Sequence, residues 1–307
     1  MPADVSVDFC GVKMRNPTVL ASGILGTSAA ILKRVYHEGG AGAVITKSIG
    51  PVDRAGWNNP TVIEFDAGFL NAVGLPSQGV ENARKELEEL RDSKIEWFAS
   101  VYAGSVEEFV SVSEKCIAFS NAPVLELNLG CPNTKEHGMA FGKDPKVAFD
   151  VVSRVKNAVG SKTKVMPKLT PNVNDIAPIA KACEEAGADA IEAINTLAGM
   201  AIDVNTGKPI LSFKTGGVSG PAIRPVAVYS VYTIRKATQL PILGVGGISK
   251  TEHALEMMMA GANAVGIGTG VYYEGIGVFS KVSEGIRSFL EEKGFSSVKQ
   301  IVGIAQE

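Results

Sequence analysis

Three segments of the chain repeat one pattern, in which glycine ends an amphipathic stretch and an apolar run follows directly. They read GGAGAVITKS at 39–48, EAGADAIEAINT at 185–196 and MAGANAVGIGTG at 259–270. Glycine in this position is typical of a helix C-terminus that leads into a buried strand. The aligned alanines at 41, 188 and 262 lie 147 and 74 residues apart. If 74 residues hold two β–α units, one unit takes about 37 residues and the chain holds about eight, which predicts a (β/α)8 TIM barrel.

The other apolar runs supply the remaining strands of such a barrel. Each run is continuous rather than alternating, as expected for parallel strands that are covered on both faces. The predicted strands are 18–23, 43–48, 97–102, 124–129, 164–169, 190–195, 242–246 and 264–268. Helical patterns lie between most of them, at 79–92, 106–119, 145–159, 174–186, 221–236 and 250–260. We expect one α/β domain over residues 1–307, with an open doubly wound sheet as the alternative.

Two connections are too long for the barrel unit. Residues 49–78 follow the second predicted strand, and residues 197–220 follow the sixth. Connections of this size inside a compact domain are usually functional, so we expect both insertions to contribute to the site. The segment VSVDFCGVKMRNP at 5–17, within about the first 16 residues, predicts a short hairpin before the barrel.

Composition excludes several classes of protein. The chain is 45% hydrophobic and 20% charged, which excludes a disordered protein. Its net charge is −2 without a basic stripe, so nucleic acid is not an expected partner. The longest apolar runs are strand-sized, and the start MPADVSVDFCG lacks the features of a signal peptide, so no membrane association is expected. The four cysteines lie far apart with no CxxC pair, which favours a cytoplasmic protein with no metal site.

Polar residues follow several of the predicted strands. In (β/α)8 barrels the C-terminal strand ends carry the active site, so these side chains are expected to converge. Glycine pairs end the last two strands, at 244–247 and 266–270, where such barrels bind phosphate through backbone N–H groups. Lys47 and Lys168 also close apolar runs. Each is either a solvated surface lysine or a group that stabilises negative charge developing during a reaction.

The segment ELNLGCPN at 126–133 places two amides and a thiol at one strand end: Asn128, Cys131 and Asn133. The amides can orient a flat polar substrate, and a thiol with a tuned pKa can act as base or nucleophile. Cys116 and Cys183 fall in helical patterns and are interpreted as packing residues. No histidine pairs convincingly with the thiol, which argues against a thiol protease.

Nine motifs along the chain together resemble the class 1 dihydroorotate dehydrogenases. They are ASG (21–23), TKS (46–48), NAVGLPSQG (71–79), ELNLGCPN (126–133), KLTPNV (168–173), INT (194–196), TGGVSGPAIRP (215–225), GVGG (244–247) and GIGTG (266–270). The resemblance covers essentially the whole length and is strongest to the class 1B catalytic subunits. It implies a cytoplasmic oxidoreductase that binds one FMN and oxidises dihydroorotate to orotate in de novo pyrimidine (UMP) biosynthesis.

The resemblance also implies roles for individual residues. Cys131 matches the base that removes the C5 proton while hydride passes from C6 to FMN N5, and Lys168 matches the residue that balances charge on the reduced flavin. Flavin-binding positions match Ser22, Lys47, Ser48, Asn128, Lys168, Ile194, Gly220, Gly246, Gly247, Gly268 and Thr269. Substrate-binding positions match Lys47, Asn71, Ala72, Val73, Gly74, Leu75, Asn128, Asn133, Asn195 and Thr196.

The chain departs from the family pattern at two places. Ser100 stands where the family usually has an asparagine that contacts the flavin, and it is taken as a cofactor-binding residue. Gly130 stands before Cys131, where the family usually has serine. The insertion at 197–220 is similar to the family's mobile loop, whose closure we expect to exclude water during the reaction.

The segment KLTPN resembles the corresponding segment of the subfamily that passes electrons to NAD. The resemblance therefore implies NAD as the electron acceptor. No GxGxxG nicotinamide fingerprint opens a helix after the first predicted strand. The resemblance therefore implies a homodimer core in a heterotetramer with an iron–sulfur flavoprotein subunit, and FAD and the 2Fe–2S cluster are expected only in that partner.

Four alternatives stay open at this point. The flavin domain of dihydropyrimidine dehydrogenase shares KLTPNV and GGVSG-AIRP, but its catalytic loop resembles CPHGM. A tRNA-dihydrouridine synthase is also a flavin barrel with a catalytic cysteine, but it needs a basic RNA-binding surface. A non-redox phosphate-binding barrel needs neither the Cys131 loop nor Asn71, and a simple flavin electron carrier needs no cluster of amides.

Overall fold

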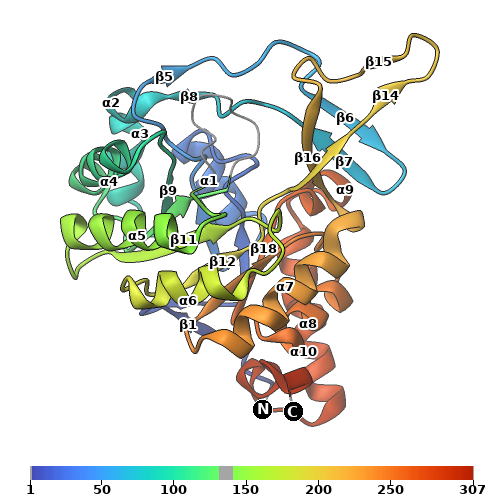
Figure 1. Ribbon diagram of the computed structural model, residues 1–307. Helices are drawn as coiled ribbons and strands as arrows, with labels where there is room; N and C mark the ends of the chain where they lie inside the picture. Colours follow the sequence, from blue (N-terminus) through green and yellow to red (C-terminus); the bar gives the residue numbers. More distant parts are fainter. Residues whose placement is uncertain (1, 131–140, 307) are drawn as a thin grey trace.

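Eight parallel strands close into a barrel in the computed structural model, which describes residues 2–130 and 141–306. Figure 1 shows the barrel surrounded by helices. In barrel order the strands are β3 (Thr18–Leu20), β4 (Ala43–Ile45), β9 (Trp97–Val101), β10 (Val124–Asn128), β11 (Lys164–Leu169), β12 (Ile191–Ala193), β17 (Ile242–Val245) and β18 (Ala264–Ile267). Strand β18 pairs with β3, so the sheet closes and the open-sheet alternative is wrong. The predicted (β/α)8 fold is confirmed.

Helices cover the outside of the barrel, as the predicted β–α units require (Figure 1). Their buried faces join the barrel strands in one hydrophobic core. The helices are α1 (Ala29–His37), α2 (Gly79–Asn82), α3 (Arg84–Arg91), α4 (Val106–Ser120), α5 (Pro145–Val159), α6 (Ala177–Glu185), η1 (Pro221–Ile223), α7 (Arg224–Ala237), α8 (Thr251–Ala260), α9 (Gly270–Glu274), α10 (Val278–Lys293), η2 (Val298–Ile301) and η3 (Ile304–Gln306). The helix predicted at 79–92 is divided at Ala83, and the one predicted at 221–236 begins as the short η1.

The repeated glycines end helices, as the sequence pattern predicts. Gly187 follows α6 with φ +89°, and Gly261 caps α8 with φ +130°. L-residues with a Cβ rarely adopt these angles, so glycine lets the chain leave each helix and enter the next strand. Gly40, after α1, has φ +78° and does the same before β4. The internal repeat therefore marks the α-to-β turns of the barrel.

The two long insertions pair with each other. From the first come β6 (Val62–Phe65) and β7 (Gly68–Asn71), and from the second β13 (Leu197–Met200) and β16 (Thr215–Ser219). They form one antiparallel sheet in the order β13-β16-β7-β6. The smaller pairs β5 (Asp53–Arg54) with β8 (Ser77–Gln78) and β14 (Ile202–Asp203) with β15 (Lys208–Pro209) complete the insertions. Much of what the sequence pattern predicts as long loops is therefore sheet, placed at one end of the barrel (Figure 1).

The predicted N-terminal hairpin lies at the opposite end, near both termini (Figure 1). It consists of β1 (Val7–Phe9) and β2 (Val12–Met14). The ring of Phe9 is fully buried and stacks on Phe98 of β9 with ring centroids 6.1 Å apart, so the hairpin packs against the barrel interior. In the described ranges, no helix combines the length and hydrophobicity that spanning a membrane requires.

Candidate active site

A cavity of about 400 Å³ opens at the C-terminal ends of the barrel strands, beneath the inserted sheet. Its volume is within the range of small-molecule and cofactor sites. Among its lining residues are most of the side chains and glycines that the sequence predicts: Ser22, Lys47, Ser48, Asn71, Val73, Gly74, Leu75, Asn128, Lys168, Ile194, Asn195, Thr196, Gly220, Gly246, Gly247, Gly268 and Thr269. The barrel and its insertions therefore bring residues from across the chain into one site.

Two predicted residues do not line this cavity. The hydroxyl of Ser100 is fully buried, 2.8 Å from both Ser48 Oγ and Glu126 Oε1, so it lies one layer below the cavity wall. Ala72 packs instead with Leu70 on the other face of the inserted sheet. Successive side chains of an extended strand alternate between faces, and the neighbours of Ala72 take the cavity face. Cys131 and Asn133 lie outside the described residues.

Several cavity residues were not predicted from the sequence. Phe69 of β7 and Tyr272 of α9 line the cavity, and their rings pack edge to face with centroids 4.7 Å apart. Val62 of β6 and Ile24, after β3, add further apolar wall. Alternation from the predicted Asn71 would have indicated Phe69, which lies two residues earlier in an extended segment. For Tyr272 the local sequence offers no comparable signal.

A chain of amide hydrogen bonds crosses the cavity floor. Asn195 Nδ2 donates to Asn128 Oδ1 at 3.0 Å, and Asn128 Nδ2 donates to Ser48 Oγ at 3.3 Å. Thr196 N donates to Asn195 Oδ1 at 2.8 Å, which holds that amide in place. Across the cavity, Asn71 Nδ2 donates to Gly217 O at 3.1 Å. Several amides therefore surround one space, an arrangement that suits a flat ligand with ring N–H and C=O groups.

Glycines line the end of the cavity next to β17 and β18. A Cβ on Gly268 would meet only Ala21 Cβ, at 3.9 Å, so the backbone there faces open space. Gly247 has φ +73°, and a Cβ on it would lie 2.7 Å from Arg224 Cβ and 2.9 Å from Gly220 O. Bare backbone with room in front of it is what close approach of a phosphate requires. The backbone at Gly268 has this room, whereas the absent Cβ of Gly247 makes room for Arg224 and Gly220 and so shapes the cavity wall. This end of the cavity can take a phosphate group such as that of FMN.

Replacing Gly247 with alanine is expected to weaken FMN binding roughly tenfold or more (about 1.4 kcal/mol), because the added Cβ would lie 2.7 Å from Arg224 Cβ and 2.9 Å from Gly220 O and would displace the backbone that lines the cavity. The measurement is an FMN titration of the flavin-free protein followed by flavin fluorescence. Gly160→Ala is the matched control, since Gly160 also has positive φ (+71°) but no atom within 4 Å of a Cβ and no place in the cavity. Equal losses of FMN affinity in both variants would contradict the assignment.

Lys168 is the charged group at the centre of the cavity floor. Its ammonium lies 2.6 Å from Glu192 Oε1 and donates to Ser22 Oγ at 3.2 Å. Burial lowers the pKa of Lys168, but Glu126 and Glu192 raise it by more, so the net shift is upward and the lysine is charged. The site therefore presents a fixed cation to whatever occupies the cavity.

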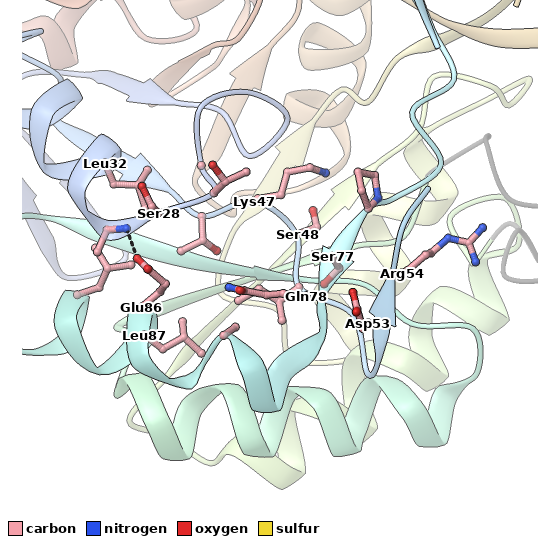
Figure 2. A pocket seen from close by; sticks show the side chains of 18 of the residues that line it. Ser28, Leu32, Lys47, Ser48, Asp53, Arg54, Ser77, Gln78, Glu86 and Leu87 are labelled. Atoms are coloured by element: carbon pink, nitrogen blue, oxygen red, sulfur yellow. Dashed lines mark hydrogen bonds between the residues drawn. The ribbon is translucent and has the colours of Figure 1, made fainter. Parts of the chain in front are cut away.

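A second cavity, also of about 400 Å³, shares Lys47 and Ser48 with the first. Figure 2 shows it between the N-terminus of α1, helix α3 and the β5–β8 pair. Glu86 Oε2 accepts from Ala29 N at 2.6 Å and so occupies the N-terminus of α1. The segment that follows β4 therefore lines both cavities. Lys47 N donates to Gly26 O at 2.7 Å, which holds this segment in place.

The described cysteines lack the features of reactive thiols. Burial raises the pKa of Cys10, Cys116 and Cys183 to about 12 in each case. These thiols stay protonated near neutral pH, which agrees with the packing role predicted for the two helical cysteines. Among the described residues, no group of three or more His, Cys, Asp or Glu side chains has a geometry that could hold a metal ion.

Comparison with known proteins identifies the family to which this chain belongs. The family model described as Dihydroorotate dehydrogenase matches residues 4–290. Three similar proteins, each described as dihydroorotate dehydrogenase B (NAD(+)), catalytic subunit, come from Methanosarcina mazei, Methanothermobacter thermautotrophicus and Pyrococcus abyssi. They are 47%, 45% and 43% identical to this chain, covering 97%, 99% and 98% of it and 94%, 99% and 99% of their own lengths.

A solved structure supports the fold. The structure described as DHODH in complex with ferulenol from Eimeria tenella superimposes with a TM-score of 0.85, at 21% identity, over 99% of this chain and 89% of that one. At this identity the likeness concerns the architecture alone. The family match over most of the chain and the relatives at more than 40% identity carry the assignment: the chain belongs to the dihydroorotate dehydrogenase family, within the group of class 1B catalytic subunits.

Proposed function

We propose that this chain is the catalytic subunit of an NAD-dependent dihydroorotate dehydrogenase and oxidises dihydroorotate to orotate in pyrimidine biosynthesis. The observation that carries the proposal is a single cavity that combines a glycine-lined end, a buried lysine and a set of convergent amides. A phosphate-bearing flavin and a flat carboxylated ring together need these three features. The runner-up functions each need only some of them.

FMN is the proposed cofactor, one per chain in a single barrel domain. When bound, it would supply the two-electron acceptor for the oxidation. Gly246, Gly247, Gly268 and Thr269 would hold its phosphate end, because they line the cavity just past the ends of β17 and β18, where backbone N–H groups can meet phosphate oxygens. The other proposed flavin contacts that line the cavity are Ser22, Lys47, Ser48, Asn128, Lys168, Ile194 and Gly220.

The substrate would lie beneath the inserted sheet. Asn71, Asn128 and Asn195 converge there with amide groups that can bond the ring's N–H and C=O groups, and Asn133 is proposed to join them. Lys47 lines the same space and is proposed to meet the carboxylate. Such a group of fixed donors and acceptors orients the ring and limits the water that reaches it.

Cys131 is the proposed base. It follows Asn128 by three residues, and Asn128 is the last residue of β10 and lines the cavity. In this proposal the thiolate accepts the proton from C5 of dihydroorotate, while Lys168 supplies positive charge to offset the negative charge that develops during the oxidation. The buried thiols at Cys10, Cys116 and Cys183 are unsuited to this role because burial raises their pKa values.

The proposed electron acceptor is NAD, reached through a partner subunit. The similar proteins are described as NAD(+)-linked and as catalytic subunits, which supports a second subunit. We propose that this subunit is an iron–sulfur flavoprotein with FAD and a 2Fe–2S cluster, joined to a homodimer of this chain as a heterotetramer.

The test is anaerobic reduction of the purified, FMN-loaded chain. We expect a yellow protein whose visible absorbance is bleached by dihydroorotate. Dihydrouracil, which has the same ring without the carboxylate, should bleach it far more slowly. A colourless protein that does not take up FMN would favour a non-redox phosphate-binding barrel. A yellow protein that dihydroorotate fails to bleach would favour an electron carrier, and preferential bleaching by dihydrouracil would favour a dihydropyrimidine dehydrogenase.

A further inference from the structure

Two glutamates lie fully buried inside the barrel, below the proposed flavin site. Glu126 is in β10 and Glu192 is in β12, on either side of the strand β11 that carries Lys168. Lys168 lines the cavity and the two carboxyl groups do not, so the ammonium stands between the cavity and both acids. The reaction proposed above assigns no role to either glutamate.

The contacts of Glu126 favour its ionised form. Its Oε1 accepts two hydroxyl hydrogen bonds, from Ser22 Oγ and from Ser100 Oγ, each at 2.8 Å. Donors that bond a carboxylate stabilise its charge. Its other oxygen, Oε2, has no hydrogen-bond partner within the described part of the chain.

The contacts of Glu192 are different. Its Oε1 lies 2.6 Å from Lys168 Nζ, and no described hydroxyl or amide donates to either of its oxygens. If both acids were ionised, two negative charges would share one positive charge in the barrel interior, and Glu126 Oε2 and Glu192 Oε2 would have neither a donor nor a cation among the described residues. Such an arrangement is strongly unfavourable. One proton between the two carboxyl groups removes a charge and gives the orphaned oxygens a partner.

We propose that Glu192 is a positioning residue that carries this proton and donates it in a hydrogen bond to Glu126, so that the trio Glu126, Lys168 and Glu192 is neutral overall with its positive end toward the cavity. The proposal rests on the proposed function, because its consequence concerns the charge that an electron-accepting cofactor meets. With Glu192 neutral, the negative charge lies deeper than the ammonium, and the cavity floor favours added negative charge.

The surrounding charges agree with this arrangement. Burial raises the pKa of Glu192 well above its ordinary value, the charge of Glu126 raises it further, and Lys168 offsets only part of the rise. The strands packed beside β12 are β11, which contributes Lys168, and β17, whose residues Ile242–Val245 do not titrate. From β10 comes Glu126, the nearest other acid.

A dependence on pH follows. When pH rises through the raised pKa of Glu192, the acid ionises and a second negative charge appears beneath the flavin site. Adding electrons to the cofactor then becomes harder, and reduction is accompanied by proton uptake at Glu192. Over that interval the reduction equilibrium gains an extra dependence of up to about tenfold per pH unit.

The same shift affects folding in the absence of flavin. A group whose pKa is raised in the folded state contributes stability at low pH and loses it as pH rises from the ordinary glutamate pKa towards the raised one. Glu192→Gln keeps the shape, stays neutral and can still donate to Glu126. We expect this variant to keep the wild-type potential at neutral pH and to lose both the extra pH dependence of the potential and the loss of stability with rising pH.

The experiment compares the wild type, Glu192→Gln and the control Glu185→Gln, whose side chain is exposed at the end of α6. The flavin midpoint potential is measured with redox dyes from mildly acidic to alkaline pH. Infrared spectra of the flavin-free chains are recorded at neutral pH. We expect the carbonyl band of a protonated carboxylic acid in the wild type and Glu185→Gln, and its loss in Glu192→Gln.

Two results would overturn the proposal: no protonated-acid band in the wild type, or a Glu192→Gln potential with the wild-type pH dependence. A band that survives in Glu192→Gln would place the proton elsewhere and would also overturn it. If Glu192→Gln does not fold, the wild-type infrared spectrum decides together with the pH dependence of the wild-type potential, and absence of either one overturns the proposal. Failure of dihydroorotate to bleach the wild type, with the band and the pH dependence present, would instead contradict only the proposed substrate.

Discussion

Replacing Cys131 with serine is expected to slow the bleaching of the FMN-loaded chain by dihydroorotate about 10²–10⁴-fold at neutral pH, the usual contribution of a general base. A hydroxyl is a far weaker base than a thiolate, so the proton at C5 of the substrate would leave more slowly. The yellow colour and the FMN affinity should not change, because Cys131 is not one of the proposed flavin contacts. The measurement is stopped-flow absorbance under anaerobic conditions.

Cys10→Ser is the matched control for this variant. Cys10 lies in the N-terminal hairpin region at the other end of the barrel, and its Sγ donates to Asp189 O at 3.5 Å, a bond that a serine hydroxyl can also make. We expect it to reduce at the wild-type rate. An unchanged rate in Cys131→Ser would remove this thiol from the mechanism, and equal slowing in both variants would indicate a general effect of thiol loss.

Replacing Lys168 with methionine is expected to lower the free energy of unfolding by about 3–5 kcal/mol, the usual cost of leaving a buried charge without its partner. The variant retains the buried carboxyls of Glu126 and Glu192 but lacks their cation. The measurement is urea unfolding of the flavin-free chain. Lys162→Met, an exposed lysine that precedes the same strand, should change stability by less than about 0.5 kcal/mol.

Double variants built on Lys168→Met test which of the two carboxyl groups is ionised. Glu126→Gln added to Lys168→Met should recover most of the lost stability, because it removes the ionised member of the trio. Glu192→Gln added to Lys168→Met should recover little, because that acid is proposed to be neutral already. Equal recovery by the two substitutions would contradict the assigned charges, while no loss in Lys168→Met would contradict the ion pair itself.

The barrel was predictable because its strands are short, continuous and apolar. Each of the eight predicted strands begins at or within one residue of its observed start. The ends are less accurate, since the apolar pattern continues past the last ladder hydrogen bond: β3 ends at Leu20 rather than at 23, and β4 at Ile45 rather than at 48. Most residues in these overhangs line the cavity, which explains why the motif positions were found.

The inserted sheet was not predictable in the same way. Its strands are four or five residues long, and its central pair joins Asn71 to Gly217, which are 146 residues apart. Local pattern carries no information about which short segments will pair over such a distance. For that reason the sequence predicted two functional insertions but not that they form one cover. That Phe69 faces the cavity while Ala72 faces away follows from strand alternation once this segment is known to be a strand.

Ser100 and the two glutamates show the same limit inside the barrel. Polar residues within a buried strand need partners, but the sequence does not say which ones. The structure pairs Ser100 with Ser48 and Glu126, and it brings Glu192 to Lys168. These contacts join strands that are far apart in the chain. Ser100 was predicted to contact the flavin, but its contacts place it in the layer below the cavity.

The sequence by itself determined the eightfold repeat, the positions of the barrel strands and the end of the barrel at which the site lies, because burial and helix termination leave local patterns. Only the tertiary structure decided how the two insertions meet and which side chains reach the cavity. It also placed two acids and one lysine together in the interior. The physical reason is that charge neutrality and hydrogen-bond satisfaction in a barrel depend on contacts across strands, which no local pattern in the chain encodes.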